Sequence, residues 1–146
     1  MTASVDRDII IINTPLPTRD YFSLLGAIDC YVSLHRSEGL GLPIFEAMHL
    51  GKPVIATNYG GNAGIMLEEC SYPVRYTPTQ VKKTFGPYQA GNTWADPDVS
   101  HAAERMLDVY SDAQTVSSKT DAAKTLLSRM AKDSRTVLMR ELIRVS

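Results

Sequence analysis

The residues best suited to chemistry lie between positions 33 and 48, around a glycine turn. Gly39 and Gly41 carry no side chain that would hold a ligand away from the backbone, and Pro43 fits the first turn of a following helix. A helix start offers unpaired N–H groups and the positive end of a dipole, which together attract phosphate. We expect an anion site formed by the N–H groups of Gly41, Leu42 and Ile44.

Two glutamates flank this turn, Glu38 before it and Glu46 within the expected helix. A carboxylate accepts hydrogen bonds through two oxygens, so it suits the neighbouring hydroxyls of a ribose or a hexose. Two such acids beside an anion site suggest a nucleotide sugar as ligand. On spacing alone, an alternative stays open, in which Glu38 is a solvated loop residue and Glu46 is a first-turn acid favoured by the dipole.

Other polar residues sit near the same turn. His35 either donates to a sugar or phosphate, or only hydrogen-bonds the loop backbone. A second glycine turn, residues 58–62, contacts the ligand or is structural. Arg36 is expected to be structural or solvated, with contact to a phosphate as the alternative, and Trp94 is expected to cover the core, with stacking on a sugar as the alternative.

The elements that must position these residues alternate along the first half of the chain. Short apolar runs predict strands at residues 9–12, 30–34 and 52–57. Between them, helices are expected at 19–28, with Thr18 as N-cap, and at 44–49. This alternation indicates a parallel sheet with helices on both faces, and the glycine turn then lies at the carboxyl end of a strand, where open sheets bind ligands.

The second half of the chain follows a different pattern. Residues 72–76 predict an edge strand because of the prolines nearby, and residues 84–98 predict a long loop pinned by Tyr88 and Trp94. Asp96 or Asp98 is expected to cap a helix over 99–110, and another helix follows over 121–145. We divide the single domain into a β/α core at 8–76, the loop at 84–98 and helices at 99–146.

Composition excludes several classes of function. The 146 residues carry 15 Lys and Arg against 16 Asp and Glu, so no basic face for nucleic acid is expected. The longest purely apolar run, Ile9 to Ile12, is far shorter than the roughly 20 residues of a membrane span. The cysteines and histidines lack metal-ligand spacing, so no metal is expected. Residues 1–8 lack a secretory pattern, which favours a cytoplasmic location.

The whole string around the turn resembles the retaining GT-B glycosyltransferases of family four, the glycosyl transferases of group 1. Seven residues separate Glu38 from Glu46, Gly-Leu-Gly-Leu follows the first, and Glu-Ala-Met-His-Leu-Gly-Lys-Pro-Val-Ile-Ala-Thr begins with the second. Residues 29–37, 59–62 and 94–98 fit the same family. The resemblance runs from about residue 8 to residue 110 and implies a Rossmann-like donor-binding domain with no metal and no cofactor.

The resemblance also implies roles for individual residues. Glu46 would hold the donor ribose, Glu38 would lie beside the transferred sugar as a catalytic residue, and the amides of the turn would meet the sugar and diphosphate. The donor-binding set would comprise His35, Gly39, Leu40, Gly41, Leu42 and Glu46. In such enzymes the reaction retains the anomeric configuration and is commonly described as front-face attack with the departing phosphate as base.

The matching segment corresponds to part of a donor domain. In relatives, two preceding β-α units carry the Arg and Lys that neutralise the diphosphate, and an acidic residue stands where this chain has Gly64. We expect nucleotide sugar as partner, with an acceptor domain or a second chain, homo-oligomers through open sheet edges, and peripheral membrane contact in the full enzyme. The alternative is a non-catalytic remnant, or one subunit of a split enzyme, that binds nucleotide weakly or acts in assembly.

Overall fold

The computed structural model describes residues 8–144. Helices and strands alternate first, then a hairpin follows, then two helices close the fold. The elements in chain order are α1 (Thr18–Ala27), β1 (Tyr31–Ser33), α2 (Leu42–His49), β2 (Val54–Thr57), β3 (Tyr72–Val74), β4 (Tyr76–Gln80), β5 (Thr93–Pro97), α3 (Val99–Ser111) and α4 (Ala113–Arg144).

The central sheet is parallel, with strand order β1-β2-β3. Val32 pairs with Ile55, and Ala56 pairs with Pro73. Pro73 has no N–H to offer a further strand, so β3 occupies an edge, as predicted from its prolines. Because the strands are parallel, all three carboxyl ends meet at one rim of the sheet, and the glycine turn leaves the sheet at that rim.

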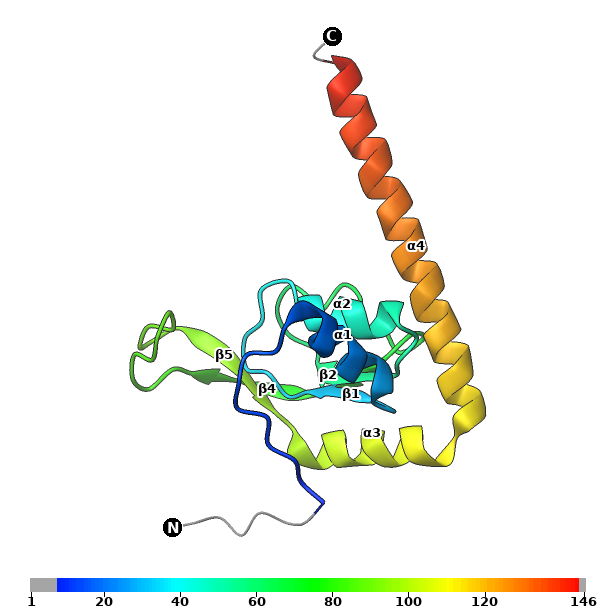
Figure 1. Cartoon of the computed structure of the whole chain (residues 1–146). Coiled ribbons are helices and arrows are strands. Elements are labelled where there is room, and N and C mark those ends of the chain that lie inside the picture. Colours follow the sequence, from blue (N-terminus) through cyan, green and yellow to red (C-terminus); the bar gives the residue numbers. More distant parts are fainter. Residues whose placement is uncertain (1–7, 145–146) are drawn as a thin grey trace.

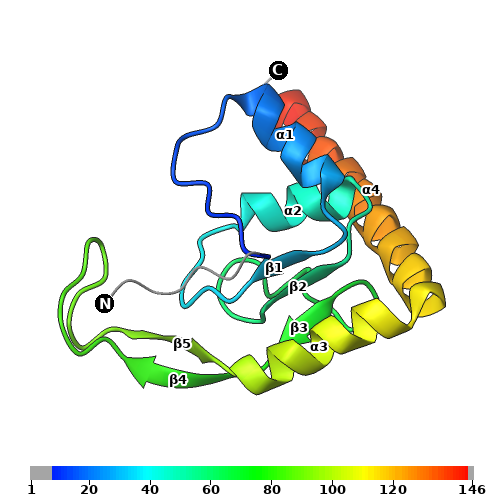
Figure 2. The ribbon, with the colours of Figure 1, turned by 60° about the horizontal axis from the view of Figure 1, so that its bottom comes forward.

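Helices cover both faces of this sheet, which confirms the α/β prediction (Figure 1). Figure 2 shows α2 on one face of the strands and α3 on the other. Successive side chains of a strand point to opposite faces, so Val54 and Ala56 pack toward α2 while Ile55 packs toward α3. On the α2 face, Val54 and Ala56 belong to a hydrophobic core cluster that also contains buried side chains from α1, α2 and α4, namely Leu25, Ile44, Ala47, Met48 and Ala123.

A hairpin stands where sequence analysis placed part of a long loop. β4 and β5 pair antiparallel, with Thr79 opposite Trp94, so residues 93–97 form a strand and not a loop. The sequence signal is weak there because β5 buries only Ala95 fully and includes both Asp and Pro. The rings of Tyr88 and Trp94 do lie together, 5.8 Å apart.

The two C-terminal helices confirm the prediction of a helical last third. Asp98 is the N-cap of α3, and its carboxylate accepts the His101 N–H at 2.9 Å. α4 begins at Ala113, earlier than expected, because Asp112 caps its first turn by accepting from the Thr115 N–H at 2.9 Å. Its second half extends beyond the rest of the fold (Figure 1). Within residues 8–144, no helix has both the length and the apolar character needed to cross a bilayer.

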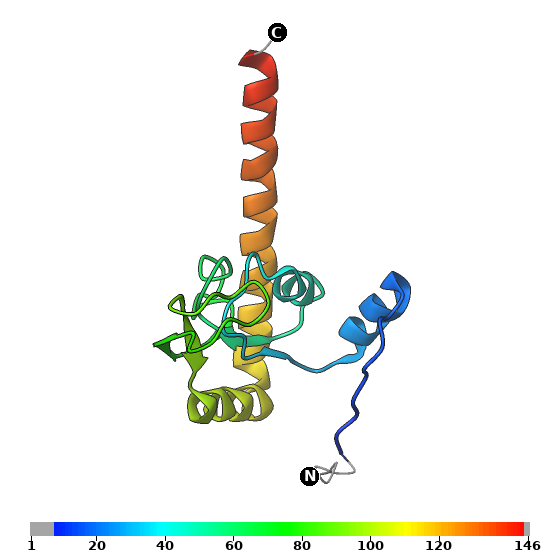
Figure 3. The ribbon, with the colours of Figure 1, turned by 90° about the vertical axis from the view of Figure 1, so that its left-hand side faces the viewer.

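The N-terminal segment differs from its prediction. Ile9 to Ile12 form no strand, and their exposed fractions lie between 51 and 87%. An apolar run is buried in a sheet only where a neighbouring strand pairs with it, and the structure places no described strand beside the outer edge of β1. Thr18 is not the N-cap of α1 either, since Pro17 occupies that position without a side-chain cap. Figure 3 shows α1 to one side of the sheet.

Candidate functional site

The start of α2 is shaped by a glycine in a left-handed conformation. Gly41 is the N-cap with φ 76° and ψ 45°, a backbone region that residues with a Cβ rarely adopt. A side chain there would press within 3.2 to 3.4 Å of Ile44, Asn62 and Glu38. Pro43 lies in the first helical turn, as the sequence predicted.

The anion site is narrower than expected. The Ile44 N–H donates to the Gly41 carbonyl at 2.8 Å, so it is not available to a ligand, contrary to the prediction. The chain tightens into a three-residue turn at this helix start, which uses up that donor. Among the described residues, no acceptor is paired with the N–H groups of Gly41 and Leu42. These two amides remain for an anion at the open end of α2.

The second glycine turn supports the first through backbone contact. Gly61 N–H donates to the Glu38 carbonyl at 3.2 Å. A Cβ on Gly61 would lie 1.6 Å from the Gly39 carbonyl oxygen, and one on Gly60, with φ 95°, would lie 2.4 Å from that of Glu38. The glycines at 60 and 61 therefore have a structural task, because only bare backbone allows the two turns to approach so closely.

The charges of both glutamates act on one tyrosine of β1. Burial raises the pKa of Tyr31, a hydrogen bond with Ser33 lowers it, and the charges of Glu38 and Glu46 raise it. Both carboxylates therefore lie within electrostatic reach of a single phenol on β1. Sequence reasoning missed Tyr31, whose side chain shares with Ser33 the face of β1 that α2 covers.

Glu46 has a second aromatic neighbour, also missed by sequence reasoning. The Tyr21 hydroxyl, on α1, donates to Glu46 Oε2 at 2.6 Å. Burial, followed by this hydrogen bond and the charge of Glu46, raises the pKa of Tyr21 to about 12. Helical spacing puts Tyr21 among the apolar residues of α1 and gives no sign that its hydroxyl meets an acid 25 residues away.

His35 lies on the same rim with both ring nitrogens engaged. Nδ1 is 3.2 Å from the Ser33 hydroxyl and Nε2 is 3.0 Å from the Tyr59 carbonyl. The carbonyl requires a proton on Nε2, so Nδ1 accepts from Ser33. His35 thus joins the ends of β1 and β2.

Arg36 and Trp94 attach the hairpin to this rim. Arg36 pairs with Asp96 at 2.8 Å, and its guanidinium lies 5.0 Å from the centre of the Trp94 ring. The Arg36 carbonyl also accepts the Ala95 N–H at 2.8 Å. These contacts make Arg36 structural, in line with the sequence interpretation.

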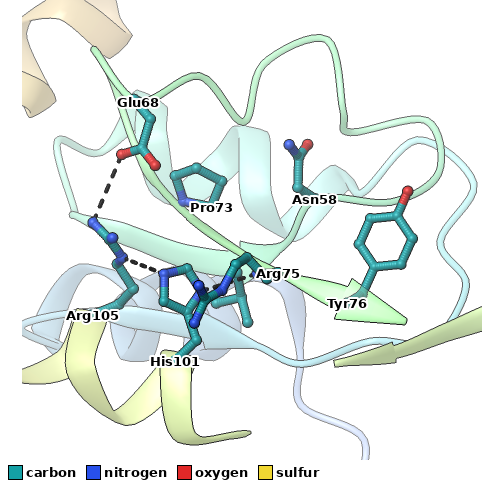
Figure 4. A pocket seen from close by; sticks show the side chains of 8 residues that line it. Asn58, Glu68, Pro73, Arg75, Tyr76, His101 and Arg105 are labelled. Atoms are coloured by element: carbon teal, nitrogen blue, oxygen red, sulfur yellow. Dashed lines mark hydrogen bonds and ion pairs between the residues drawn. The ribbon is translucent and has the colours of Figure 1, made fainter. Parts of the chain in front are cut away.

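A separate cavity of about 550 Å³ runs along the outer edge of β3 (Figure 4). Its charges are largely paired within the protein, with Arg105 3.8 Å from Glu68 and Arg75 3.4 Å from Asp98. Buried His101 lies between the Arg75 backbone N–H, 3.0 Å from Nδ1, and the Arg105 side chain, 3.1 Å from Nε2. A neutral imidazole accepts at one nitrogen only, so just one of these contacts is a hydrogen bond.

Another cavity, of about 510 Å³, lies between α1, α2 and α4 and has Glu46 in its wall. The other lining residues are mostly apolar: Phe22, Phe45, His49, Leu50, Leu127, Met130 and Ala131. One side of Glu46 therefore borders an apolar space.

Comparison with known proteins gives two similarities. The family model described as glycosyl transferases group 1 matches residues 10–69, which include both glutamates and both glycine turns. Trehalose phosphorylase from Grifola frondosa is 26% identical over 121 residues, which is 83% of this chain and 14% of that protein. The chain therefore spans about one seventh of that relative's length. These similarities support the resemblance to glycosyltransferases noted in the sequence.

Proposed function

We propose that this chain binds a nucleotide diphosphate sugar at the start of α2, as the donor-binding part of a retaining glycosyltransferase of family four. The observation that carries the proposal is the pairing of an open helix start with two glutamates. Gly41 and Leu42 keep unpaired N–H groups there among the described residues, the side chain of Glu38 comes close to Gly41, and Glu46 lies on α2 itself. The family match over residues 10–69 supports the same assignment.

Each part of the ligand has a chemically suited partner. The amides of Gly41 and Leu42, with the dipole of α2 behind them, suit the diphosphate. Glu46 suits the ribose hydroxyls, and Glu38, one residue before the turn, suits the transferred sugar as the catalytic residue of the site. Gly39 and Leu40 form the rest of the proposed donor-binding surface. A contact from His35 requires that one of its two protein hydrogen bonds be exchanged for the ligand.

The acceptor side of the reaction is proposed to come from elsewhere. Because the chain spans 14% of its trehalose phosphorylase relative, a larger protein or a second chain would supply the acceptor domain and the basic residues for the leaving diphosphate. We propose no metal or cofactor for this chain.

A second candidate ligand is a sugar phosphate. The relative that matches 83% of this chain is named as a phosphorylase, an enzyme class that passes a glycosyl group to phosphate. A single phosphate would use the same two amides and the same Glu38, but it would leave Glu46 without a ribose. The two candidates therefore differ in their dependence on Glu46.

Calorimetric titration tests both candidates on the purified chain. UDP, GDP, their hexose conjugates and glucose 1-phosphate are titrated into the unaltered protein, Glu46→Gln and Glu69→Gln, an exposed glutamate outside the site. We expect one nucleotide series to bind and Glu46→Gln to weaken it by roughly 1 to 3 kcal/mol, because a charged acceptor is lost. Glu69→Gln should bind as the unaltered protein does.

The other outcomes also decide between the interpretations. Binding of glucose 1-phosphate alone, unaffected by Glu46→Gln, would favour the sugar phosphate. No binding of any of these compounds would contradict the proposed function and favour the non-catalytic alternative.

A further inference from the structure

Glu46 is held by a phenol from a different helix. The Tyr21 hydroxyl donates to Glu46 Oε2 at 2.6 Å, a length typical of a hydrogen bond from a hydroxyl to a charged carboxylate. The other oxygen, Oε1, accepts no hydrogen bond from the described residues. One half of the carboxylate is therefore fixed by the protein, while the other half remains for a ligand.

We propose that Tyr21 is a positioning residue, which fixes the plane of the Glu46 carboxylate so that Oε1 faces the ribose of a bound nucleotide. This inference rests on the proposed function. The last torsion of a glutamate side chain is broad, so an unrestrained carboxylate would turn freely about it. A hydrogen bond to one oxygen removes that freedom before the ligand arrives, and so lowers the cost of binding.

Tyr21 is suited to this task in its protonation and its packing. With a pKa raised to about 12, it keeps its proton and remains a donor throughout the neutral range. Its ring packs against the core cluster and stands edge-on to Phe22, with the ring centres 5.2 Å apart. The cavity wall beside Glu46 is mostly apolar and includes Phe22 and Phe45, and an apolar surrounding strengthens a hydrogen bond.

A purely structural tie between α1 and α2 would have a different effect. It would hold the helices together, and its loss would weaken binding of every ligand by the same factor. A positioning residue acts through the carboxylate, so its loss reduces the preference for ligands that carry ribose hydroxyls. The ratio of two dissociation constants separates these roles.

The test measures Kd for UDP, GDP and ADP and for their 2′,3′-dideoxy forms. The proteins are the unaltered chain, Tyr21→Phe, Glu46→Gln, the double variant and Tyr110→Phe, which removes an exposed hydroxyl on α3. Tyr21→Phe keeps the ring and its packing, and circular dichroism checks the fold. We expect Tyr21→Phe to reduce the preference for the ribose form by about five-fold, as loss of one hydrogen bond implies. The substitution should have no further effect in Glu46→Gln.

The possible results separate failure of the proposed function from failure of the role proposed for Tyr21. If no nucleotide binds the unaltered chain, the proposed function is contradicted and this inference falls with it. If nucleotides bind without preference for ribose, the role of Glu46 and this inference are both overturned. If the preference exists but is the same in Tyr21→Phe, the inference alone is overturned and Tyr21 is structural. An equal loss in Tyr110→Phe would overturn it as well.

Discussion

Two regions of the chain differ sharply in how closely they are packed: the rim, which the two glycine turns form, and the N-terminal segment before α1. The same family match covers nearly all of both regions. At the rim, backbone packs against backbone, and Gly61 leaves no room for a methyl group. In the N-terminal segment, Ile10 is 87% exposed, whereas Ile55 in β2 is fully buried. These two isoleucines thus differ in burial because Ile55 has a strand on each side and Ile10 has none within the described part of the chain.

The two regions differ in whether nearby residues alone determine their conformation. The rim is fixed by local features, namely glycines, a proline and short turns whose demands are met within a few residues. The N-terminal segment depends on a partner strand, which local sequence does not specify. Open apolar segments favour association, so homo-oligomer formation through this region stays a prediction.

The largest expected effect lies at the contact between the turns. Gly61→Ala should destabilise the protein by about 4 kcal/mol or more, because the new Cβ meets the Gly39 carbonyl and backbone must shift. Urea unfolding followed by circular dichroism measures the change. Gly64→Ala is the matched control, since a Cβ there meets nothing within 4 Å, and it should change stability by about 1 kcal/mol or less. Equal effects of the two substitutions would refute the tight packing of the turns.

A matched pair of isoleucines tests the contrast directly. Ile55→Ala should cost about 2 to 5 kcal/mol, because it opens a cavity in the sheet core. Ile10→Ala should cost no more than about 0.5 kcal/mol, because that side chain is mostly solvated already. Thermal and urea unfolding of both variants at one low protein concentration give the comparison. A large loss of stability in Ile10→Ala would show that the N-terminal segment is buried against a partner.

The smallest expected effect compares the starts of two helices. Asp98 caps α3, and the hydrogen bond from the His101 N–H, together with nearby Arg75, lowers the pKa of its carboxyl below the usual 3.8. A lowered pKa in the folded state adds stability above 3.8 that is lost as the pH falls through the folded value. Asp98→Asn keeps a capping side chain but removes this charge.

The unfolding midpoints of the unaltered chain and Asp98→Asn should therefore differ at about pH 6 and converge toward about pH 3. Asp98→Ala removes the cap itself, so this variant should be less stable than Asp98→Asn at both pH values. A constant gap between the unaltered chain and Asp98→Asn would show that the charge of Asp98 does not stabilise α3. The starts of α2 and α3 would then not differ in stabilisation by a charged cap, although no side chain caps the start of α2.

Much of the fold could be predicted because its signals are local. Short apolar runs predicted β1 and β2, helical spacing of apolar residues predicted α1, and the prolines near β3 placed that strand at an edge. β5 escaped prediction because its pairing with β4 depends on main-chain contacts with a distant segment, and its composition suggests a loop. Ile9 to Ile12 were wrongly predicted as a strand because residue type reports the tendency to be buried but not the presence of a neighbour.

The candidate site was predicted in its outline but not in its details. The glycines, Pro43 and the position of Gly41 at the helix start followed from sequence. The loss of the Ile44 N–H to the Gly41 carbonyl did not, because the tightness of a turn depends on backbone angles. The hydrogen bond from Tyr21 to Glu46 was missed because it joins separate elements, and so was the electrostatic effect of both glutamates on Tyr31. The ligand roles of Glu38, Glu46 and His35 stay predictions.

Backbone amide shifts recorded by NMR during addition of UDP-glucose and GDP-mannose test the central claim most directly. If a nucleotide sugar binds at the start of α2, one of these donors shifts the amides of Gly39, Leu40, Gly41 and Leu42, with the largest changes at Gly41 and Leu42, while the amides of α3 stay in place. No shift at the start of α2, or shifts centred instead on Arg75 and His101 along the edge of β3, would contradict it.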